Sequence, residues 1–187
     1  RRYLDGSEVD IFAESAGLAA LEKHLQSENP RDILFAIEML AQNDPAILVN
    51  ALPHLLTHAN AAVRLTAVQQ LTSQNEDALP WLEVLAQDVL QPIEVRAAAL
   101  QRLASMGESA AQILPAYLSD SNIELRFAGV VGALQSHSLE VILAAGDILS
   151  AAQNDSSPEM RCFAARVIGA VGNVGFHRNL LSLLNDS

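Results

Sequence analysis

Apolar residues recur along the chain at the spacing of amphipathic helices. One such stripe, on a single face of a helix with 3.6 residues per turn, is Ile47, Leu48, Ala51, Leu52 and Leu55. Breaks in the pattern divide the chain into short helices that alternate with short turns. The pattern predicts helix pairs over 17–27 with 31–42, 46–57 with 61–73, 76–88 with 92–105, 109–119 with 122–135, and 138–152 with 157–171, followed by a last helix over 174–185.

Residues typical of helix ends stand at these breaks. Asp44 and Ser157 are predicted N-caps, because their side chains can accept hydrogen bonds from the first free N–H groups of a helix. Pro45 suits the first helical position, and Gly107 and Gly172 suit the position just past a helix end. The predicted helix boundaries are therefore supported by capping residues as well as by the spacing of the apolar residues.

One short motif repeats within the second helix of each pair. It consists of an apolar residue, an arginine, two further residues and a small residue, and the arginines lie 32, 30 and 35 residues apart. A degenerate copy, with Ile33 in the place of the arginine, stands 31 residues before the first of them. The four complete copies contain Arg64, Arg96, Arg126 and Arg161. Such self-similarity is typical of repeat proteins, in which each unit buries its apolar face against its neighbours.

A Leu-Pro motif precedes three of these copies. Pro53 and Pro115 each lie 11 residues before their arginine, whereas Pro80 lies 16 residues before. The unit with Pro80 is therefore expected to contain about a turn and a half of extra helix or loop near 88–92.

The two motifs, in this order, resemble the HEAT-repeat family. The resemblance covers about residues 17–185 and implies an all-α fold: an α-α superhelix, or HEAT-type solenoid, of about five helix pairs plus a terminal helix. Residues 1–16 would be a lead-in segment and 17–187 a single solenoid domain. The resemblance also implies that Arg64, Arg96, Arg126 and Arg161 form a structural ladder with turn residues, which here are Asn60, Asp120, Asn122 and Asp155.

A narrower resemblance covers residues 27–45. This run is similar to the HEAT segment attached to bacterial ATP/ADP-carrier-like membrane proteins of the major-facilitator type, which implies a cytoplasmic module beside a membrane-embedded bundle. The chain begins with Arg1-Arg2 and no methionine, and we expect it to be an excised piece of a longer protein or a processed product. None of the transport machinery would lie in this piece.

Charge and composition narrow the possible partners. The formal net charge is −11, which opposes binding to phosphate backbones and to anionic lipid heads, so nucleic acid is not expected as a partner. No apolar run approaches the roughly 18 residues that span a bilayer, so direct membrane insertion is not expected either. Cys162, the single cysteine, rules out an intramolecular disulfide and is expected to be a buried or half-buried packing residue. A cytoplasmic location follows from the resemblance and fits this cysteine count.

Candidate chemistry is sparse, and we expect no catalytic residues, no metal site and no cofactor. Among the five histidines, His54 and His58 share a helix face four residues apart, but two ligands at a helix end fall short of a closed metal site. The sequence contains no His-Glu pair of the kind found in HEAT-like iron hydroxylases. We therefore expect a non-catalytic module for protein–protein interaction or scaffolding. The alternative is a HEAT-like lyase or an accessory subunit of an enzyme.

A protein or peptide partner is expected on the surface formed by the second helices. Aligned copies place Glu38, Gln69, Gln101, Val131 and Arg166 in one column, and Met39, Gln70, Arg102, Gly132 and Val167 in another. The predicted binding residues are Gln69, Gln70, Gln101, Arg102 and Arg166; a solvated polar face is the alternative. Phe35 and Phe163 lie one position before the small residue of the motif and Phe127 lies two before it; the three are either exposed anchors or, as we expect, core residues. A further alternative is an anionic ligand held by the four ladder arginines.

Overall fold

The computed structural model describes residues 16–73, 75–106 and 110–172. Within these ranges the chain is helical and has no β-strand, so the predicted all-α fold class is confirmed. The chain divides into two compact units, which we call unit 1 (up to Leu71) and unit 2 (from Thr72). The sequence pattern did not indicate this division. Below, the first helix of each pair is its A helix and the second is its B helix.

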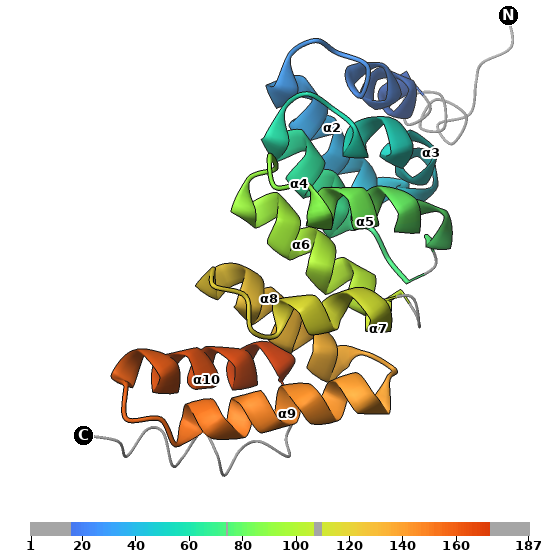
Figure 1. Ribbon diagram of the computed structural model, residues 1–187. Helices are drawn as coiled ribbons and strands as arrows, with labels where there is room; N and C mark the ends of the chain where they lie inside the picture. The colour runs from blue at the N-terminus through green and yellow to red at the C-terminus, as the bar shows by residue number, and fades with distance from the viewer. Residues whose placement is uncertain (1–15, 74, 107–109, 173–187) are drawn as a thin grey trace, which may run out of the picture. The chain divides into compact units, whose positions relative to one another are not determined.

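Unit 1 contains two A helices and two B helices. A helix over 16–24 precedes α2 (Pro30–Asn43), α3 (Pro45–Leu56) and α4 (Ala61–Gln70). The B helices α2 and α4 pack against each other and both pack against α3, as Figure 1 shows. Their shared core consists of fully buried aliphatic residues, among them Ile33, Ile37, Leu40, Leu55 and Leu56.

Unit 2 continues the alternation of A and B helices. Its elements are η1 (Glu76–Ala78), α5 (Leu79–Gln87), α6 (Ile93–Ala104), α7 (Ala110–Ile113), η2 (Leu114–Tyr117), α8 (Ile123–Gln135), α9 (Leu139–Gln153) and α10 (Pro158–Val171). Each B helix packs on the next, α6 on α8 and α8 on α10, while α5 covers α6 and α9 lies beside α10 (Figure 1). This packing of successive helix pairs is consistent with an α-α superhelix.

Most predicted helix ends agree with the structure. Asp44 Oδ1 accepts a hydrogen bond of 3.2 Å from the backbone N–H of Ala46, and Pro45 occupies the first turn of α3. Gly172 ends α10 with a φ of 65°, a left-handed conformation that favours glycine. Ser157 stands at the N-cap position of α10, but its hydroxyl donates to Glu159 instead of capping the helix. The lead-in segment, Gly107 and the last predicted helix (174–185) lie outside the described residues.

Two of the expected helices are interrupted. The helix expected over 109–119 is a short α7 followed by the 3-10 turn η2, which contains Pro115; proline removes a backbone donor and favours a break in α-helical bonding. The helix expected over 76–88 begins with η1, and Pro80 lies in the first turn of α5.

The extra residues expected near 88–92 form a loop between α5 and α6. Asp88 organises it: its Oδ1 accepts a hydrogen bond from the Leu90 N–H, and its Oδ2 accepts one from Gln91 Nε2, both at 2.9 Å. Val89 and Leu90 are 77% and 89% exposed. The polar residues of this loop hold its backbone, and its aliphatic side chains face solvent.

The three phenylalanines of the repeated motif differ in burial. Phe163 of α10 is 2% exposed and Phe127 of α8 is half-buried, with the two rings edge to face at 6.5 Å. Phe35 of α2 is 52% exposed. Core packing is therefore correct for Phe163, partly correct for Phe127 and wrong for Phe35.

Candidate functional site

The turn between the A and B helices has the same hydrogen bonds in four pairs. The first residue of the turn accepts, through its side chain, the backbone N–H two positions later, over 2.8–3.1 Å. The residue two positions later is the N-cap of the B helix. These first residues are Ser27, His58, Asp120 and Asp155.

Three of the four ladder arginines donate to backbone carbonyls of these same turns. Arg64, Arg126 and Arg161 each bond to the carbonyl six residues earlier, over 2.6, 2.8 and 2.8 Å. Arg96 reaches ten residues back, to the Ala86 carbonyl at 3.0 Å, because the loop near 88–92 lengthens its turn. A carbonyl near a helix end has no partner within the helix, so a guanidinium that donates to it ties the A helix to the B helix.

The first pair has no ladder arginine and closes its turn differently. Ile33 occupies the arginine position and is buried in the core. Asp32, one residue earlier, accepts hydrogen bonds from Ser27 Oγ at 3.0 Å and from Asn29 Nδ2 at 3.2 Å. The ladder arginines thus hold the turns together, and this arrangement offers no support for a shared anion site.

Loss of one ladder guanidinium should destabilise the fold. Replacement of Arg126 by methionine, which keeps the length of the side chain, is expected to lower the free energy of unfolding by about 1.5–3 kcal/mol, since a charged donor to a half-buried carbonyl is lost. The control is Arg31→Met, which removes the same charge from an exposed position and should change stability by less than about 0.5 kcal/mol. Urea unfolding of both variants measures the difference; equal values would contradict a structural role for Arg126.

A polar hollow lies between the B helices of unit 1. It has a volume of about 540 Å³ and is lined by Leu34, Glu38, Ala41, Gln42, Thr66 and Gln70. Gln70, a predicted binding residue, therefore lies in a concave site together with Glu38 from the other predicted column. Gln69 is exposed on the same helix, but it does not line the hollow.

Two more predicted binding residues lie next to each other on α6 of unit 2. Gln101 and Arg102 are both half-buried. Burial lowers the pKa of the Arg102 guanidinium, because partial removal from water disfavours its charged form. A cation held in this way can contribute more to a contact than a fully hydrated one.

Arg166, the fifth predicted binding residue, is engaged within unit 2. Its Nη1 and Nη2 donate to the Oε1 and Oε2 of Glu124 at 3.0 and 2.9 Å, and its guanidinium carbon lies 4.7 Å from the centre of the Phe127 ring. Both charged side chains remain about half exposed, at 45% and 48%. The pair joins α10 to α8. Its hydrogen bonds lower the pKa of the Glu124 carboxyl and raise the pKa of Arg166.

The Glu124–Arg166 pair should make stability depend on pH in one direction. Because the pKa of Glu124 is lowered in the folded state, the stabilisation is present above the usual range of a glutamate and is lost as the pH falls through the lowered value. A double-mutant cycle with Glu124→Gln and Arg166→Gln should give a coupling of about 0.2–1 kcal/mol at pH 7, and this coupling should decrease as the pH falls below the usual range of a glutamate. A coupling that grows on acidification would contradict this assignment.

Three positions of the predicted columns are buried and cannot contact a partner. Val131 is 4% exposed and Val167 is fully buried. A Cβ atom at Gly132 would lie 2.9 Å from the Cβ of Ala104. Val131 and Gly132 are buried because α8 packs against α6, α9, α10 and η2. Aligned positions that are accessible on α4 are therefore core positions on α8.

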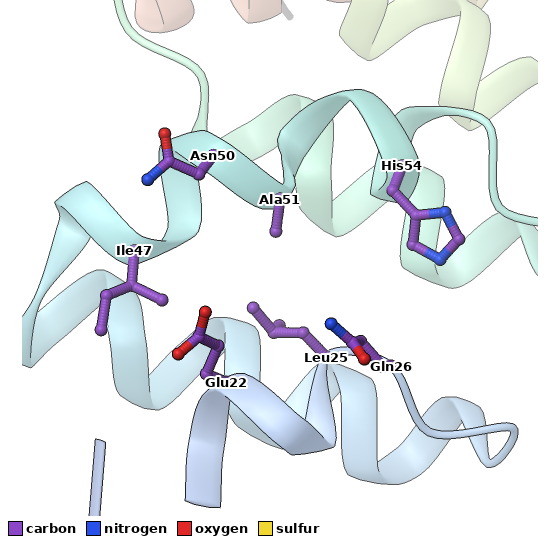
Figure 2. A pocket seen from close by; sticks show the side chains of 7 residues that line it. All are labelled: Glu22, Leu25, Gln26, Ile47, Asn50, Ala51 and His54. Carbon is purple, nitrogen blue, oxygen red and sulfur yellow. The ribbon is translucent and has the colours of Figure 1, made fainter. Parts of the chain in front are cut away.

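The structure also contains a groove that the sequence analysis missed. It lies between the A helices of unit 1, over 16–24 and in α3, and has a volume of about 560 Å³. Its lining residues are Glu22, Leu25, Gln26, Ile47, Asn50, Ala51 and His54, shown in Figure 2. The sequence contains one signal of this groove: Asn50 is a polar residue in the middle of an otherwise apolar helix.

The remaining candidate chemistry has structural explanations. His58 Nδ1 accepts the backbone N–H of Asn60 at 3.0 Å, and the His58 ring lies edge to face with that of His54 at 6.4 Å. In the described ranges, no three side chains of His, Cys, Asp or Glu are placed to hold a metal ion. Cys162 is exposed, so the expectation that it is buried or half-buried is wrong; it lies one position before Phe163, the first buried residue of α10.

The fold and these surfaces define an all-α protein of stacked helix pairs. No model of a protein family matches the chain, and no curated protein matches its sequence. Among the described helices, none combines the length and the apolar character that a membrane crossing requires.

Proposed function

We propose that the chain is a non-catalytic protein-binding module that takes a peptide or protein partner on the surface of its B helices. The observation that supports the proposal is the hollow between α2 and α4, which is lined by the polar residues Glu38, Gln42, Thr66 and Gln70 together with Leu34 and Ala41. Helix pairs stacked in this way present such a surface without any loop or lid.

The chemistry of the hollow suits a peptide backbone. A carboxamide side chain offers two donors and an acceptor, which is the complement of a peptide group, and both Gln42 and Gln70 line the hollow. Leu34 and Ala41 offer a small apolar contact beside them. Polar groups that fix orientation around an apolar contact are typical of peptide-binding grooves.

In unit 2 the corresponding B-helix surface is that of Gln101 and Arg102. A half-buried guanidinium beside a carboxamide favours a polar or acidic feature of the partner. Arg166 of α10 is held by Glu124 over Phe127, so that its guanidinium is preorganised for a partner on that B helix.

Affinity capture from extracts of the source organism tests the proposal. Gln70→Leu and Arg102→Glu should each reduce the recovery of the proteins that the wild-type chain retains, by about tenfold, which is the loss of a 1.4 kcal/mol contact. The control is Lys23→Glu, which makes the same charge reversal as Arg102→Glu at an exposed A-helix position. An unchanged set of captured proteins for both B-helix variants would contradict the proposal.

We further propose a host for this module, on the strength of the resemblance of residues 27–45. In this proposal the chain is the cytosolic regulatory part of a membrane transporter-like protein, and its location is cytoplasmic. The complete reading frame tests this: a hydrophobic bundle encoded next to the chain would support it, and a frame that encodes only helix pairs would contradict it.

A further inference from the structure

The groove between the A helices of unit 1 has an apolar floor and a polar rim. Leu25 is buried, and Ile47 and Ala51 are half-buried, so these three side chains form an aliphatic floor. Figure 2 shows Glu22, Leu25 and Gln26 reaching toward α3, while Ile47, Ala51 and His54 point back into the same space. The volume of about 560 Å³ is within the range of pockets that hold ligands.

The polar side chains at the rim have no partners within the described part of the chain. Glu22, Gln26 and Asn50 make no side-chain hydrogen bond or ion pair there, and none of the described lysines and arginines lines the groove. Asn50 is distinctive, because every other asparagine in the described ranges uses its side chain in a turn, a cap or a bond to the preceding helical turn. Asparagine is a poor helix former, and at mid-helix Asn50 gains no such compensation.

These features define the chemistry of a ligand. Glu22 repels carboxylates and phosphates and attracts a cation, and it is the only carboxylate among the described residues of the lining. The carbonyl oxygens of Gln26 and Asn50 can accept hydrogen bonds from an ammonium group. The floor of Leu25, Ile47 and Ala51 suits an aliphatic chain, and a lysine side chain combines an aliphatic stem with a charged head.

We propose that this groove binds a lysine side chain of a partner polypeptide, with the stem on the aliphatic floor and the ammonium group at Glu22. The net charge of −11 favours the approach of basic segments. The site lies on the A helices and does not depend on the binding surface proposed for the B helices.

Nuclear magnetic resonance titration of the full ¹⁵N-labelled chain tests the proposal. The probe is the blocked peptide Ala-Ala-Lys-Ala-Ala, and its matched control carries an Nε-acetyl-lysine, which keeps the stem and removes the charge. The lysine peptide should shift the amide signals of Gln26, Asn50 and Ala51, and the acetylated peptide should shift them far less. Equal shifts with the two peptides would overturn the proposal.

Substitutions at two exposed glutamates distinguish binding in the groove from the general electrostatic attraction of a basic peptide to an acidic protein. Glu22→Gln should weaken binding of the lysine peptide by about fivefold, the upper end for an exposed ion pair, and Glu28→Gln, outside the groove, should leave it unchanged. Ala51→Leu, which fills the floor, should also weaken binding. Equal affinities for the Glu22 and Glu28 variants would overturn the assignment, whereas unchanged binding by Gln70→Leu would show that this site is independent of the B-helix surface.

Discussion

Replacement of Phe163 by alanine is expected to lower the free energy of unfolding by about 3–5 kcal/mol. Phe163 is 2% exposed and packs edge to face on Phe127, so that its loss leaves a cavity between α8 and α10 and removes an aromatic contact. Urea unfolding followed by circular dichroism measures the change.

The matched control is Phe35→Ala. Phe35 occupies the same place before a small residue of the repeated motif, but it is 52% exposed on α2. Its replacement should cost less than about 1 kcal/mol, because little buried surface is lost. If both variants lost the same stability, the burial assigned to the two rings would be wrong.

Alanine at Gly132 or Gly129 of α8 is expected to destabilise the protein, although alanine favours helices. A Cβ atom at Gly129 would lie 2.8 Å from the Cβ of Tyr117, and one at Gly132 would lie 2.9 Å from the Cβ of Ala104. Overpacking of this kind costs about 1–3 kcal/mol, which exceeds the gain of about 1 kcal/mol in helix propensity. Each variant should therefore unfold at a lower urea concentration than the wild type. Gly129→Ala should lose more stability than Gly132→Ala, because its new Cβ would also meet the backbone of Tyr117, at 3.1 Å.

At two other glycines of unit 2, replacement by alanine is expected to raise the stability of the protein. Among the described residues, and apart from the backbone of its own helix, a Cβ atom at Gly146 of α9 or at Gly169 of α10 would meet no atom within 4 Å. Gly146→Ala and Gly169→Ala should each stabilise the protein by about 0.5–1 kcal/mol. A stabilising Gly132→Ala would show that α6 and α8 do not approach as closely as described.

Local chemistry made the helices and turns predictable from the sequence. Asp44, Pro45 and Gly172 act within a few residues of their own positions, so their effect on helix ends requires no knowledge of the neighbours. The arginine motif was also visible as a period. The hydrogen bonds of this motif to turn carbonyls are local as well. Arg126 stands six residues after Asp120, the first residue of its turn, and donates to the carbonyl of that residue.

The surfaces were less predictable, because they depend on which neighbours each helix has. Repeat alignment treats all B helices alike, yet the positions of Gln101 and Val131 differ: one is half-buried on α6 and the other lies in the core on α8. The partnership of Arg166 with Glu124 joins residues 42 positions apart, which no local pattern indicates. The groove beside Ala51 arises only where two A helices meet.

Site-specific photo-crosslinking tests the proposed B-helix surface most directly. A photoreactive side chain would be placed at Gln70 on α4 and at Gln101 on α6, and for comparison at the exposed Gln87 on α5 and Asp147 on α9. We predict that, in extracts of the source organism, the two B-helix positions form covalent adducts with the same partner protein and that the two A-helix positions do not. Equal adducts from A-helix and B-helix positions, or none from Gln70 and Gln101, would contradict the account.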